Sequence, residues 1–447
     1  MRRLHPPAHL HVRRLRRHVH LLPVRRRGPR RRRHRAPGPP PAGGRGARPG
    51  AAARSPLRLT SCDHGSVPQA PVAPPPHDLL DPEPVLDVGR RAGLSAVGVA
   101  PAEPFDATRR ILEERRAAGL SSDMQFTYRN PARSTDPGRT LEGAAALVVG
   151  ALAYRRPDPE PPAGTPAARV ARYAWTDDYA RLRAALEVVA EHLRAEGWRA
   201  VVVADQNALV DREAAHRAGI GWYGKSSNLL LPGAGSWFVL GSVVTDAPLR
   251  PAEAPVADGC GSCTRCIDAC PTGAIVAPGV VDARRCLAWL VQSPGALPHD
   301  HREALGDRIY GCDDCQEVCP PNHRADRLDV RRAPGSGDEP WVDLLELLAT
   351  DDATLLARHG RWYVPRRDPR YLRRNALVAL GNVGDPADPR VAQAVEDAAH
   401  HDDPMVRAHA VWAARRLGLH HVVRAASADP APEVRDELTV PVTPRSA

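Results

Sequence analysis

Eight cysteines between residues 260 and 319 constrain this chain more than any other feature. The first run reads Cys-x2-Cys-x2-Cys-x3-Cys-Pro, and a later run reads Cys-x2-Cys-x3-Cys-Pro. The first spacing is that of bacterial two-cluster ferredoxins, in which the fourth cysteine of the run binds the other cluster. Structural zinc does not explain the repeated Cys-x3-Cys-Pro, and disulfides do not suit a cytosolic enzyme. The pattern therefore predicts two [4Fe–4S] clusters.

The exchange of the fourth cysteine also predicts which thiolates share a cluster. The second run is one cysteine short, and Cys286 is available to replace it. The first cluster is expected to use Cys260, Cys263, Cys266 and Cys319, and the second to use Cys270, Cys286, Cys312 and Cys315. The ninth cysteine, Cys62, lies in the N-terminal tail and has no predicted role. Such a module only moves single electrons, so the reaction site must lie elsewhere in the chain.

The positive net charge of +10 comes entirely from the tail. Residues 1–50 hold sixteen arginines and no acidic residue, so the remaining residues together carry −6. This rules out a uniformly basic, nucleic-acid-binding fold. The Arg-, His- and Pro-rich tail is predicted to be disordered. It is a nucleic-acid arm, a dispensable extension, or coding sequence upstream of the true start.

No segment of the sequence resembles an export signal or a membrane span. The basic tail is not followed by a long apolar region, so it is a poor secretory or twin-arginine signal. No later stretch has the roughly eighteen apolar residues that a span requires. We therefore expect a soluble, cytoplasmic protein.

The rest of the chain divides into three predicted domains after a tail and linker at 1–83. Apolar runs at 94–100, 145–154, 200–204 and 236–245 read as strands, and 177–198 reads as an amphipathic helix ended by Gly197. Residues 84–250 are therefore expected to form an α/β or α+β domain. Residues 251–330 hold the cysteines. Residues 331–447 repeat an arginine at helical positions about thirty residues apart, which is typical of HEAT-like repeats.

Two residues outside the cysteine module are candidates for chemistry. Asp205 ends the apolar run at 200–204, the position where open α/β sheets place functional groups. Burial in an apolar pocket would raise its pKa and make it a proton donor, although an ordinary capping role is the alternative. Lys225 is the only lysine beside sixty-one arginines, and it is either a leftover surface residue or a selected one.

Several segments in order resemble the epoxyqueuosine reductase family. They are "AGLSSDMQFTYRNPARSTDP", "VVVADQNALVDREAAHRAGIGWYGKSSNLLL", "CGSCTRCIDACPTGAI", "RRCLAWLVQS" and "YGCDDCQEVCP", and the resemblance runs from about Leu86 to the C-terminus. It implies a multidomain α+β fold. The parts are a nitroreductase-like cobalamin-binding α/β domain, a ferredoxin-like module with two [4Fe–4S] clusters and C-terminal HEAT-like helices that help hold tRNA.

The resemblance also implies an activity. Such an oxidoreductase reduces epoxyqueuosine to queuosine at the wobble position of tRNAs with GUN anticodons, using cobalamin in its Co(I) form fed by the two clusters. Asp205 matches the aspartate that serves as proton donor in the family. A proton donor lowers the barrier, because ring opening leaves negative charge on the epoxide oxygen. A low-potential donor such as flavodoxin or ferredoxin is the implied electron source. We expect a monomer with no membrane partner.

The resemblance further implies a set of cobalamin contacts. Besides Asp205 and Lys225, the matching positions are Arg133, Ala171, Leu229, Leu240, Ala288, Gln292 and Asp313. The sequence departs from the family pattern at Ala180, where a histidine is expected, and in the residues directly after Asp205. For tRNA phosphates, the Arg-rich stretch 366–375 is the best local patch, with a solvated helix face as the alternative.

Two other functions are weighed against this one. A corrinoid iron–sulfur reductive dehalogenase uses the same two cofactor types, but it is commonly exported behind a twin-arginine signal and needs no tRNA-binding repeats. A non-catalytic electron carrier or cobalamin-reducing protein would leave Asp205 and the helical repeats unexplained.

Overall fold

The computed structural model describes residues 79–328 and 337–445. The predicted disordered tail, including Cys62, lies outside the described residues. Within them, no helix is both long enough and apolar enough to cross a membrane.

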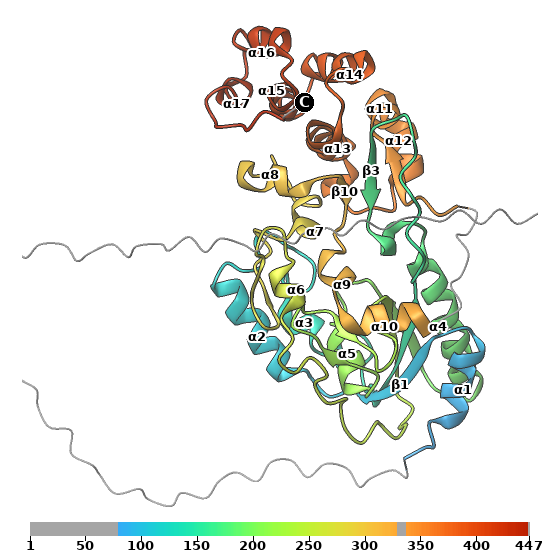
Figure 1. Ribbon diagram of the computed structural model, residues 1–447. Helices are drawn as coiled ribbons and strands as arrows, with labels where there is room; N and C mark the ends of the chain where they lie inside the picture. The colour runs from blue at the N-terminus through green and yellow to red at the C-terminus, as the bar shows by residue number, and fades with distance from the viewer. Residues whose placement is uncertain (1–78, 329–336, 446–447) are drawn as a thin grey trace, which may run out of the picture. The chain divides into compact units, whose positions relative to one another are not determined.

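A four-stranded sheet forms the centre of the N-terminal part of the described chain. Its order is β1 (Ala96–Pro101), β2 (Ala146–Ala153), β7 (Phe238–Thr245) and β4 (Ala200–Ala204). These strands confirm the four predicted apolar runs to within a few residues. Seven of the eight residues of β2 are buried, because helices cover both faces of the sheet. Helices α1 (Glu83–Arg91) and α4 (Asp178–Ala195) pack on one face, and α5 (Asp211–Arg217) packs on the other (Figure 1).

All neighbouring strands in this sheet are antiparallel. The rule that places functional groups at strand ends was derived for open parallel sheets, so it does not explain the position of Asp205. That part of the sequence argument was wrong, because an apolar run cannot reveal the direction of its neighbours.

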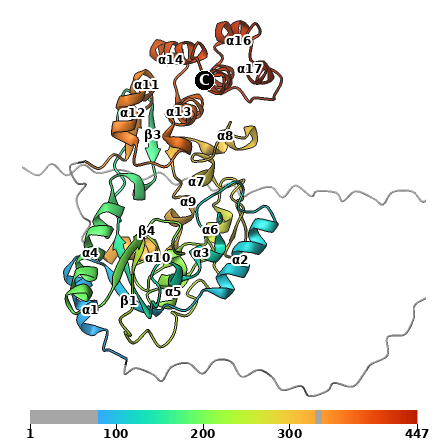
Figure 2. The same cartoon turned by 180° about the vertical axis from the view of Figure 1, so that it is seen from behind.

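Helix α4 forms as its apolar spacing predicts. Leu182, Leu186 and Leu193 are completely buried against the sheet, and Figure 2 shows α4 beside β4. The carboxylate of Asp177 accepts the N–H of Ala180 at 2.8 Å and caps the first turn. Gly197 follows the last turn at φ 93°, a conformation that glycine adopts without strain.

The remaining elements before the cysteine segment are short. They are α2 (Asp106–Ala117), α3 (Pro131–Ser134), the 3₁₀ turns Pro137–Arg139 and Arg172–Ala174, β3 (Ala167–Val170), and the hairpin of β5 (Trp222–Tyr223) and β6 (Leu229–Leu230). The cysteine segment contains α6 (Arg265–Asp268), β8 (Ile275–Ala277), β9 (Val280–Val281), α7 (Leu287–Leu290), α8 (His299–Leu305), β10 (Arg308–Tyr310), α9 (Asp314–Glu317) and α10 (Pro320–Leu328).

A second sheet joins segments from all three predicted domains. Strand β3 pairs in parallel with β10 and antiparallel with β11 (Trp341–Asp343). Residues 167–170 therefore lie outside the four-stranded sheet and pair with later parts of the chain. The domain boundaries at 250 and 330 stay a prediction, because β3, which precedes both boundaries, pairs with β10 beyond the first and with β11 beyond the second.

The C-terminal part is helical, as the arginine repeat predicts. It contains α11 (Leu344–Ala349), α12 (Asp352–His359), the 3₁₀ turn Pro365–Arg367, α13 (Arg370–Val383), α14 (Pro389–Ala399), α15 (Pro404–Leu417), α16 (His420–Ala426) and α17 (Pro432–Asp436). Helix α15 packs against α13, α14, α16 and α17. A continuous apolar core joins these helices to α7 and β10, the elements beside Cys286 and Cys312.

Candidate functional site

Asp205 is the first residue after β4 and has a left-handed backbone conformation, with φ 53°. Few residues other than glycine adopt this region, and aspartate is among the more tolerant. The side chain is exposed to solvent, yet desolvation by the surrounding protein raises its pKa. Arg183 opposes this shift and Asp177 adds to it. A carboxyl group with a raised pKa keeps its proton to higher pH, which is what a proton donor near neutrality requires.

The charge of Asp205 reaches groups on three other elements. Burial raises the pKa of Asp211, at the start of α5, well above its usual value, and Asp205 contributes next. Burial also raises the pKa of Tyr179 on α4, and again Asp205 contributes next. The pKa of Tyr310 on β10 is about 12, mainly through burial and with a smaller contribution from Asp205. The charge of Asp205 therefore acts on Tyr310 of β10, the strand that leads directly to Cys312.

Four of the eight thiols interact electrostatically, and one of them is Cys319, just before α10. The pKa of Cys319 is raised to about 11, mainly by burial and to a smaller extent by the thiols of Cys260, Cys266 and Cys263. The pKa of Cys266 is raised by burial and then by Cys260 and Cys263. These four thiols are the set predicted for the first cluster.

The other four thiols interact in a second group. Burial raises the pKa of Cys312 to about 12, and Cys286 contributes to the shift. The pKa of Cys315 is raised by burial, then by Cys312 and Cys286, and more weakly by Cys266 of the first group, while Cys270 raises the pKa of Cys286. The same four residues are predicted for the second cluster. Since the buried thiols hold their protons, cluster assembly must release those protons as it forms the thiolates.

Among the described residues, no three His, Cys, Asp or Glu side chains converge closely enough to hold one metal ion. A [4Fe–4S] cluster needs four thiolates, one at each iron.

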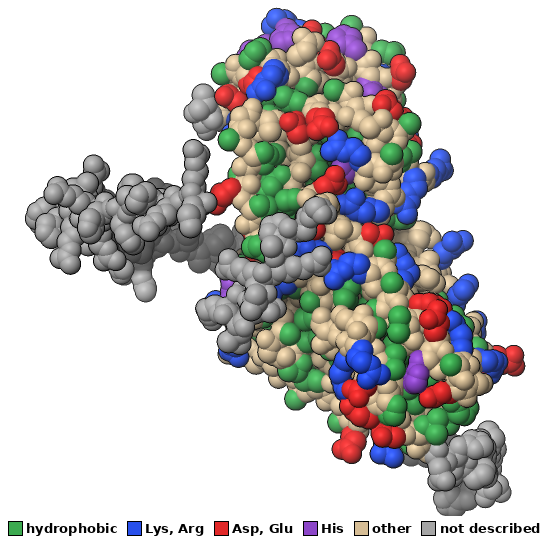
Figure 3. All heavy atoms as spheres, turned by 90° about the vertical axis from the view of Figure 1, so that its right-hand side faces the viewer, with side chains coloured by type: hydrophobic (Ala, Val, Ile, Leu, Met, Phe, Trp, Pro, Cys, Tyr) green, Lys and Arg blue, Asp and Glu red, His purple; other side chains and the backbone are tan. Residues whose placement is uncertain are grey.

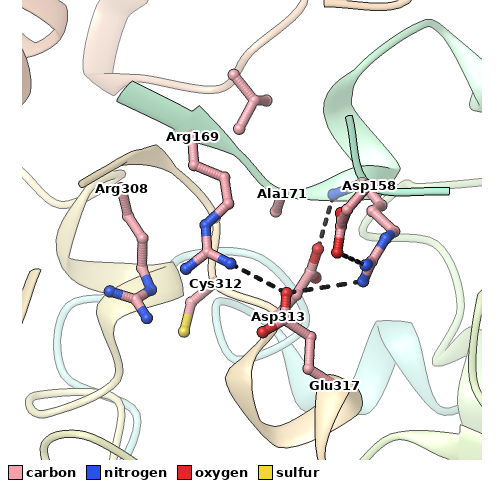
Figure 4. A pocket seen from close by; sticks show the side chains of 10 residues that line it. Asp158, Arg169, Ala171, Arg308, Cys312, Asp313 and Glu317 are labelled. Carbon is pink, nitrogen blue, oxygen red and sulfur yellow. Dashed lines mark hydrogen bonds and ion pairs between the residues drawn. The ribbon is translucent and has the colours of Figure 1, made fainter. Parts of the chain in front are cut away.

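Asp313 joins the second thiol group to the segment after β3. One carboxylate oxygen of Asp313 accepts the main-chain N–H of Arg172 at 2.7 Å, and the other accepts from Gln316 at 3.1 Å. Gly311 has φ 74°, and a Cβ at this position would lie 2.4 Å from the Cβ of Ala171. Glycine therefore lets the chain before Cys312 approach Ala171 closely (Figure 4). Of the predicted cobalamin contacts, Ala171 and Asp313 are brought together here.

The cavity beside Asp313 is small and charged. Its volume is about 10 Å³, and Arg169, Arg308 and Glu317 are among its lining residues. Arg169 forms an ion pair with Glu317 at 3.1 Å, drawn in Figure 4. A second cavity nearby has a volume of about 230 Å³. Neither is lined by Asp205, and neither is large for a ligand the size of a corrinoid.

The other residues predicted to contact cobalamin lie apart from this cavity. Leu229 and Leu240 are buried in the core on the α5 face of the sheet. Arg133 is exposed on α3. Gln292 donates to the main-chain oxygen of Ala288 at 2.7 Å, one turn earlier and beside α7.

Lys225 contacts the cysteine segment directly. Its Nζ donates to the main-chain oxygen of Gly261 at 2.6 Å, between Cys260 and Cys263. The main-chain oxygen of Lys225 accepts the N–H of Gly279 in the β8–β9 turn at 2.9 Å. Lys225 therefore joins the sheet domain to the loop of the first thiol group.

Sequence reasoning missed a buried polar network between the sheet and the second cysteine run. Asn322 on α10 accepts the main-chain N–H of Ser236 at 2.6 Å and donates to its hydroxyl at 3.0 Å. The hydroxyl of Ser236 donates to Gln316 at 2.9 Å, and Asn322 also donates to the main-chain oxygen of Gln316 at 2.8 Å. Gly235 is required here, because a Cβ would lie 1.9 Å from Asn322. The network fixes Cys315 and Cys319 relative to the sheet.

The predicted phosphate patch at 366–375 is wrong for most of its length. Arg373, Arg374 and Asn375 are buried, so they cannot contact a nucleic acid. Arg374 donates to the main-chain oxygens of four residues in the segment that follows Cys286, namely Leu290, Val291, Ser293 and Gly295. Only Arg366 and Arg367 are exposed, and both have positive φ, 58° and 56°.

The repeated arginines have a structural role instead. Arg407 pairs with Asp429 at 2.8 Å, and Arg435 donates to the main-chain oxygens of Asp429 and Pro430. They join successive helices, which explains their regular spacing without a ligand. On the face shown in Figure 3, basic and acidic side chains are interspersed rather than gathered in one basic patch.

Three family models match consecutive parts of the chain. The model described as "Epoxyqueuosine reductase QueG, DUF1730" matches residues 134–211, the 4Fe-4S double cluster binding domain matches 259–322, and HEAT repeats match 365–439. The first match ends after Asp205 and the second contains all eight cysteines.

Similar proteins cover nearly the same extent. An epoxyqueuosine reductase of Xanthomonas campestris is 37% identical over 345 residues, covering 75% of this chain and 96% of that protein. A crystal structure of epoxyqueuosine reductase with a tRNA-Tyr epoxyqueuosine-modified tRNA stem loop has a TM-score of 0.72 and 30% identity, covering 80% of this chain and 96% of that one. A Bacillus subtilis epoxyqueuosine reductase, described with its aspartate-bearing catalytic loop swung out of the active site, has a TM-score of 0.71 and 29% identity, with 80% and 96% covered.

Proposed function

The chain belongs to the epoxyqueuosine reductase family, and from this premise we propose that it reduces epoxyqueuosine to queuosine at the wobble position of tRNAs with GUN anticodons. The net reaction removes the epoxide oxygen as water, consuming two electrons and two protons and leaving an alkene. The protein must therefore supply electrons singly, deliver protons and hold the modified nucleoside.

The observation that carries this proposal is the position of Asp205. Its carboxyl group has a raised pKa, is open to solvent, and contributes to the raised pKa of Tyr310 on β10, the strand that leads to Cys312. Asp205 would protonate the epoxide oxygen as the C–O bond breaks, so that the charge developing on oxygen is neutralised. The relative whose catalytic loop carries an aspartate and swings out supports a similar role for the turn after β4.

The electrons would arrive through the two clusters predicted above. The 4Fe-4S double cluster family matches the segment that holds all eight cysteines, and the strongest couplings among their thiols mostly follow the two predicted sets of four. We propose that the group with Cys312 is the nearer to the reaction, because Cys312 follows β10 and the charge of Asp205 acts on Tyr310 of that strand. A low-potential protein such as a flavodoxin or ferredoxin would reduce the other cluster.

We also propose that the chain binds cobalamin. When bound, cob(I)alamin supplies a strong nucleophile or one-electron donor for the epoxide carbon. Residues of the chain fit this group in part: the indole Nε1 of Trp289, next to Ala288, is buried and has no hydrogen-bond partner among the described residues, and a corrinoid carries amide acceptors around its ring. Leu229 and Leu240 are apolar but buried in the core, so only the family resemblance suggests that they contact the corrinoid. Ala171 and Gln292 are likewise included because of that resemblance.

For tRNA, we propose that Arg366 and Arg367 contact phosphates near the site. Arg367 lowers the pKa of Asp205, so its charge reaches the reaction region. Phosphate contacts of this kind orient a nucleic acid, while the modified base is read at the site itself. Because the substrate is tRNA, we place the protein in the cytoplasm, and we propose that it acts as a monomer.

The function is tested with anaerobically purified protein whose clusters have been reconstituted and to which cobalamin has been added. The protein is incubated with tRNA containing epoxyqueuosine and a low-potential reductant, and the digested nucleosides are analysed by mass spectrometry. We expect queuosine from the unaltered protein and almost none from Asp205→Ala. The proposal fails if the unaltered protein forms no queuosine, or if Asp205→Ala forms it at the same rate.

A further inference from the structure

The loop between β5 and β6 contacts a thiol of the second group and the backbone beside the first group. It spans residues 224–228 and is held tightly, because the N–H of Gly224 donates to the main-chain oxygen of Asn228 at 2.8 Å. A Cβ on Gly224 would lie 2.3 Å from Leu230, so only glycine fits this turn. The hydroxyl of Ser227 donates to the main-chain oxygen of Gly279 at 2.8 Å and attaches the loop to the β8–β9 turn.

Asn228 is directed at a cluster ligand. Its Nδ2 donates to the Sγ of Cys315 at 3.8 Å. Among the hydrogen bonds of the described residues, this is the only one from a side-chain nitrogen to a cysteine sulfur. The main-chain N–H of Ala274 donates to Cys270 of the same thiol group at 3.2 Å. Three residues before Asn228, Lys225 holds the backbone of the first thiol group at Gly261.

A hydrogen bond to a cluster sulfur stabilises the reduced cluster, because reduction adds negative charge to the thiolate and sulfide atoms. The bond from Asn228 therefore raises the reduction potential of the cluster that Cys315 holds. Lys225 donates its bond to a main-chain oxygen and is partly open to solvent, so water and salt screen its charge. The same loop therefore affects the reduction potential of the second cluster more than that of the first.

We propose that Asn228 is a positioning residue for electron transfer, which makes the second cluster the acceptor by raising its reduction potential relative to the first. In this step the reduced first cluster loses one electron and the second gains it, and the external low-potential protein re-reduces the first. The inference rests on the two clusters of the proposed function. It does not depend on the substrate that finally receives the electrons.

The test compares the unaltered protein with Asn228→Leu, which keeps the side-chain volume and removes the donor. Both proteins carry reconstituted clusters without cobalamin or tRNA, and each is titrated anaerobically while EPR follows the reduced clusters. In Asn228→Leu the midpoint potential of one cluster should fall by about 59 mV. For one electron, this shift changes the equilibrium constant of electron transfer between the clusters about tenfold. Ser226→Ala is the matched control, because the structure describes no hydrogen bond of the Ser226 side chain.

A purely structural role predicts a different result. If both midpoint potentials are unchanged in Asn228→Leu while iron content stays complete, the proposal is wrong. If the variant loses iron, a second experiment uses the unaltered protein. In this protein, asparagine is labelled with ¹⁵N only at the side-chain amide. Pulsed EPR of the reduced clusters should then detect a ¹⁵N coupling in one cluster, and its absence overturns the proposal. Neither measurement uses queuosine formation, so failure here is distinct from failure of the proposed function.

Discussion

The guanidinium of Arg374 donates to the main-chain oxygen of Ser293 at 2.7 Å, which joins helix α13 to the segment that follows Cys286. Arg374 is completely buried, and burial lowers its pKa to about 9. Its hydrogen-bond partners are main-chain oxygens and the side chain of Asn375, with no ion pair to a described carboxylate. Arg374 thus donates hydrogen bonds to main-chain oxygens at the C-terminal end of α7, which have no partner within that helix.

Replacing Arg374 with methionine should destabilise the protein. The apolar side chain leaves the oxygens of Leu290, Val291, Ser293 and Gly295 without this donor, at a cost of roughly 3 kcal/mol. Thermal or denaturant unfolding measures the loss. Arg366→Met, on the exposed turn before α13, should change stability by less than about 0.5 kcal/mol. Equal stability of both variants would show that the buried contacts of Arg374 are not important.

The helix that carries Arg374 is predictable from the sequence, but the burial of Arg374 is not. The spacing of Arg374, Arg407 and Arg435 correctly predicts helical repeats, because the surrounding apolar residues recur at helical intervals. Whether an arginine on such a helix faces solvent or a neighbouring carbonyl depends on distant residues, which a local pattern does not contain. The sequence therefore predicts that residues 366–375 contact tRNA phosphates, although most of these residues are buried.

The strands and the cysteine groups were more predictable. Apolar runs such as 146–153 become buried strands whatever their neighbours, but their antiparallel order depends on contacts far apart in the sequence. Cysteine spacing encodes the cluster chemistry locally. The contacts of Lys225 with Gly261 and of Asn228 with Cys315 join residues far apart in sequence, and only the folded structure brings them together.

Cys286→Ala tests whether Cys286 is a cluster ligand. Reconstituted protein should contain about eight iron atoms per chain, and loss of this ligand from one cluster should leave about four, because alanine cannot bind iron. Iron analysis and EPR measure this. Cys62→Ala should keep the full content, because the ninth cysteine has no predicted role. Full iron content in Cys286→Ala would contradict its place among the ligands.

Asp205→Asn should abolish proton donation without disturbing the cofactors. Loss of a general acid typically lowers the rate by about 10²- to 10⁴-fold. Single-turnover formation of queuosine measures this, and iron content and tRNA affinity should stay unchanged. A rate close to that of the unaltered protein would mean that another group, such as Tyr179 or Asp211, delivers the proton.

The exposed arginines of the turn before α13 should act through phosphates. Binding of a tRNA stem loop by the double variant Arg366→Gln and Arg367→Gln should be weaker and depend less on salt. Each lost phosphate contact lowers the slope of log K against log salt by roughly 0.7 to 0.9. Arg358→Gln is the control, because Arg358 already pairs with Glu346 on the surface. An unchanged slope in the double variant would place tRNA elsewhere.

Arg183 on α4 should set the pH dependence of the reaction. Its positive charge stabilises the carboxylate of Asp205 and lowers the pKa that burial has raised. Only the protonated acid can donate, so activity is present at low pH and is lost as pH rises through this pKa. Removing the charge in Arg183→Leu raises the pKa further, and the descending part of the pH–rate profile should move to higher pH.

Single-turnover rates at saturating tRNA across the pH range measure this shift. Arg181→Leu, on the same helix, is the matched control, because Arg181 pairs with Asp178 and does not contribute to the pKa of Asp205. Its profile should coincide with that of the unaltered protein. If both variants move the profile equally, general surface charge is responsible. If neither moves it, the group that titrates is not Asp205.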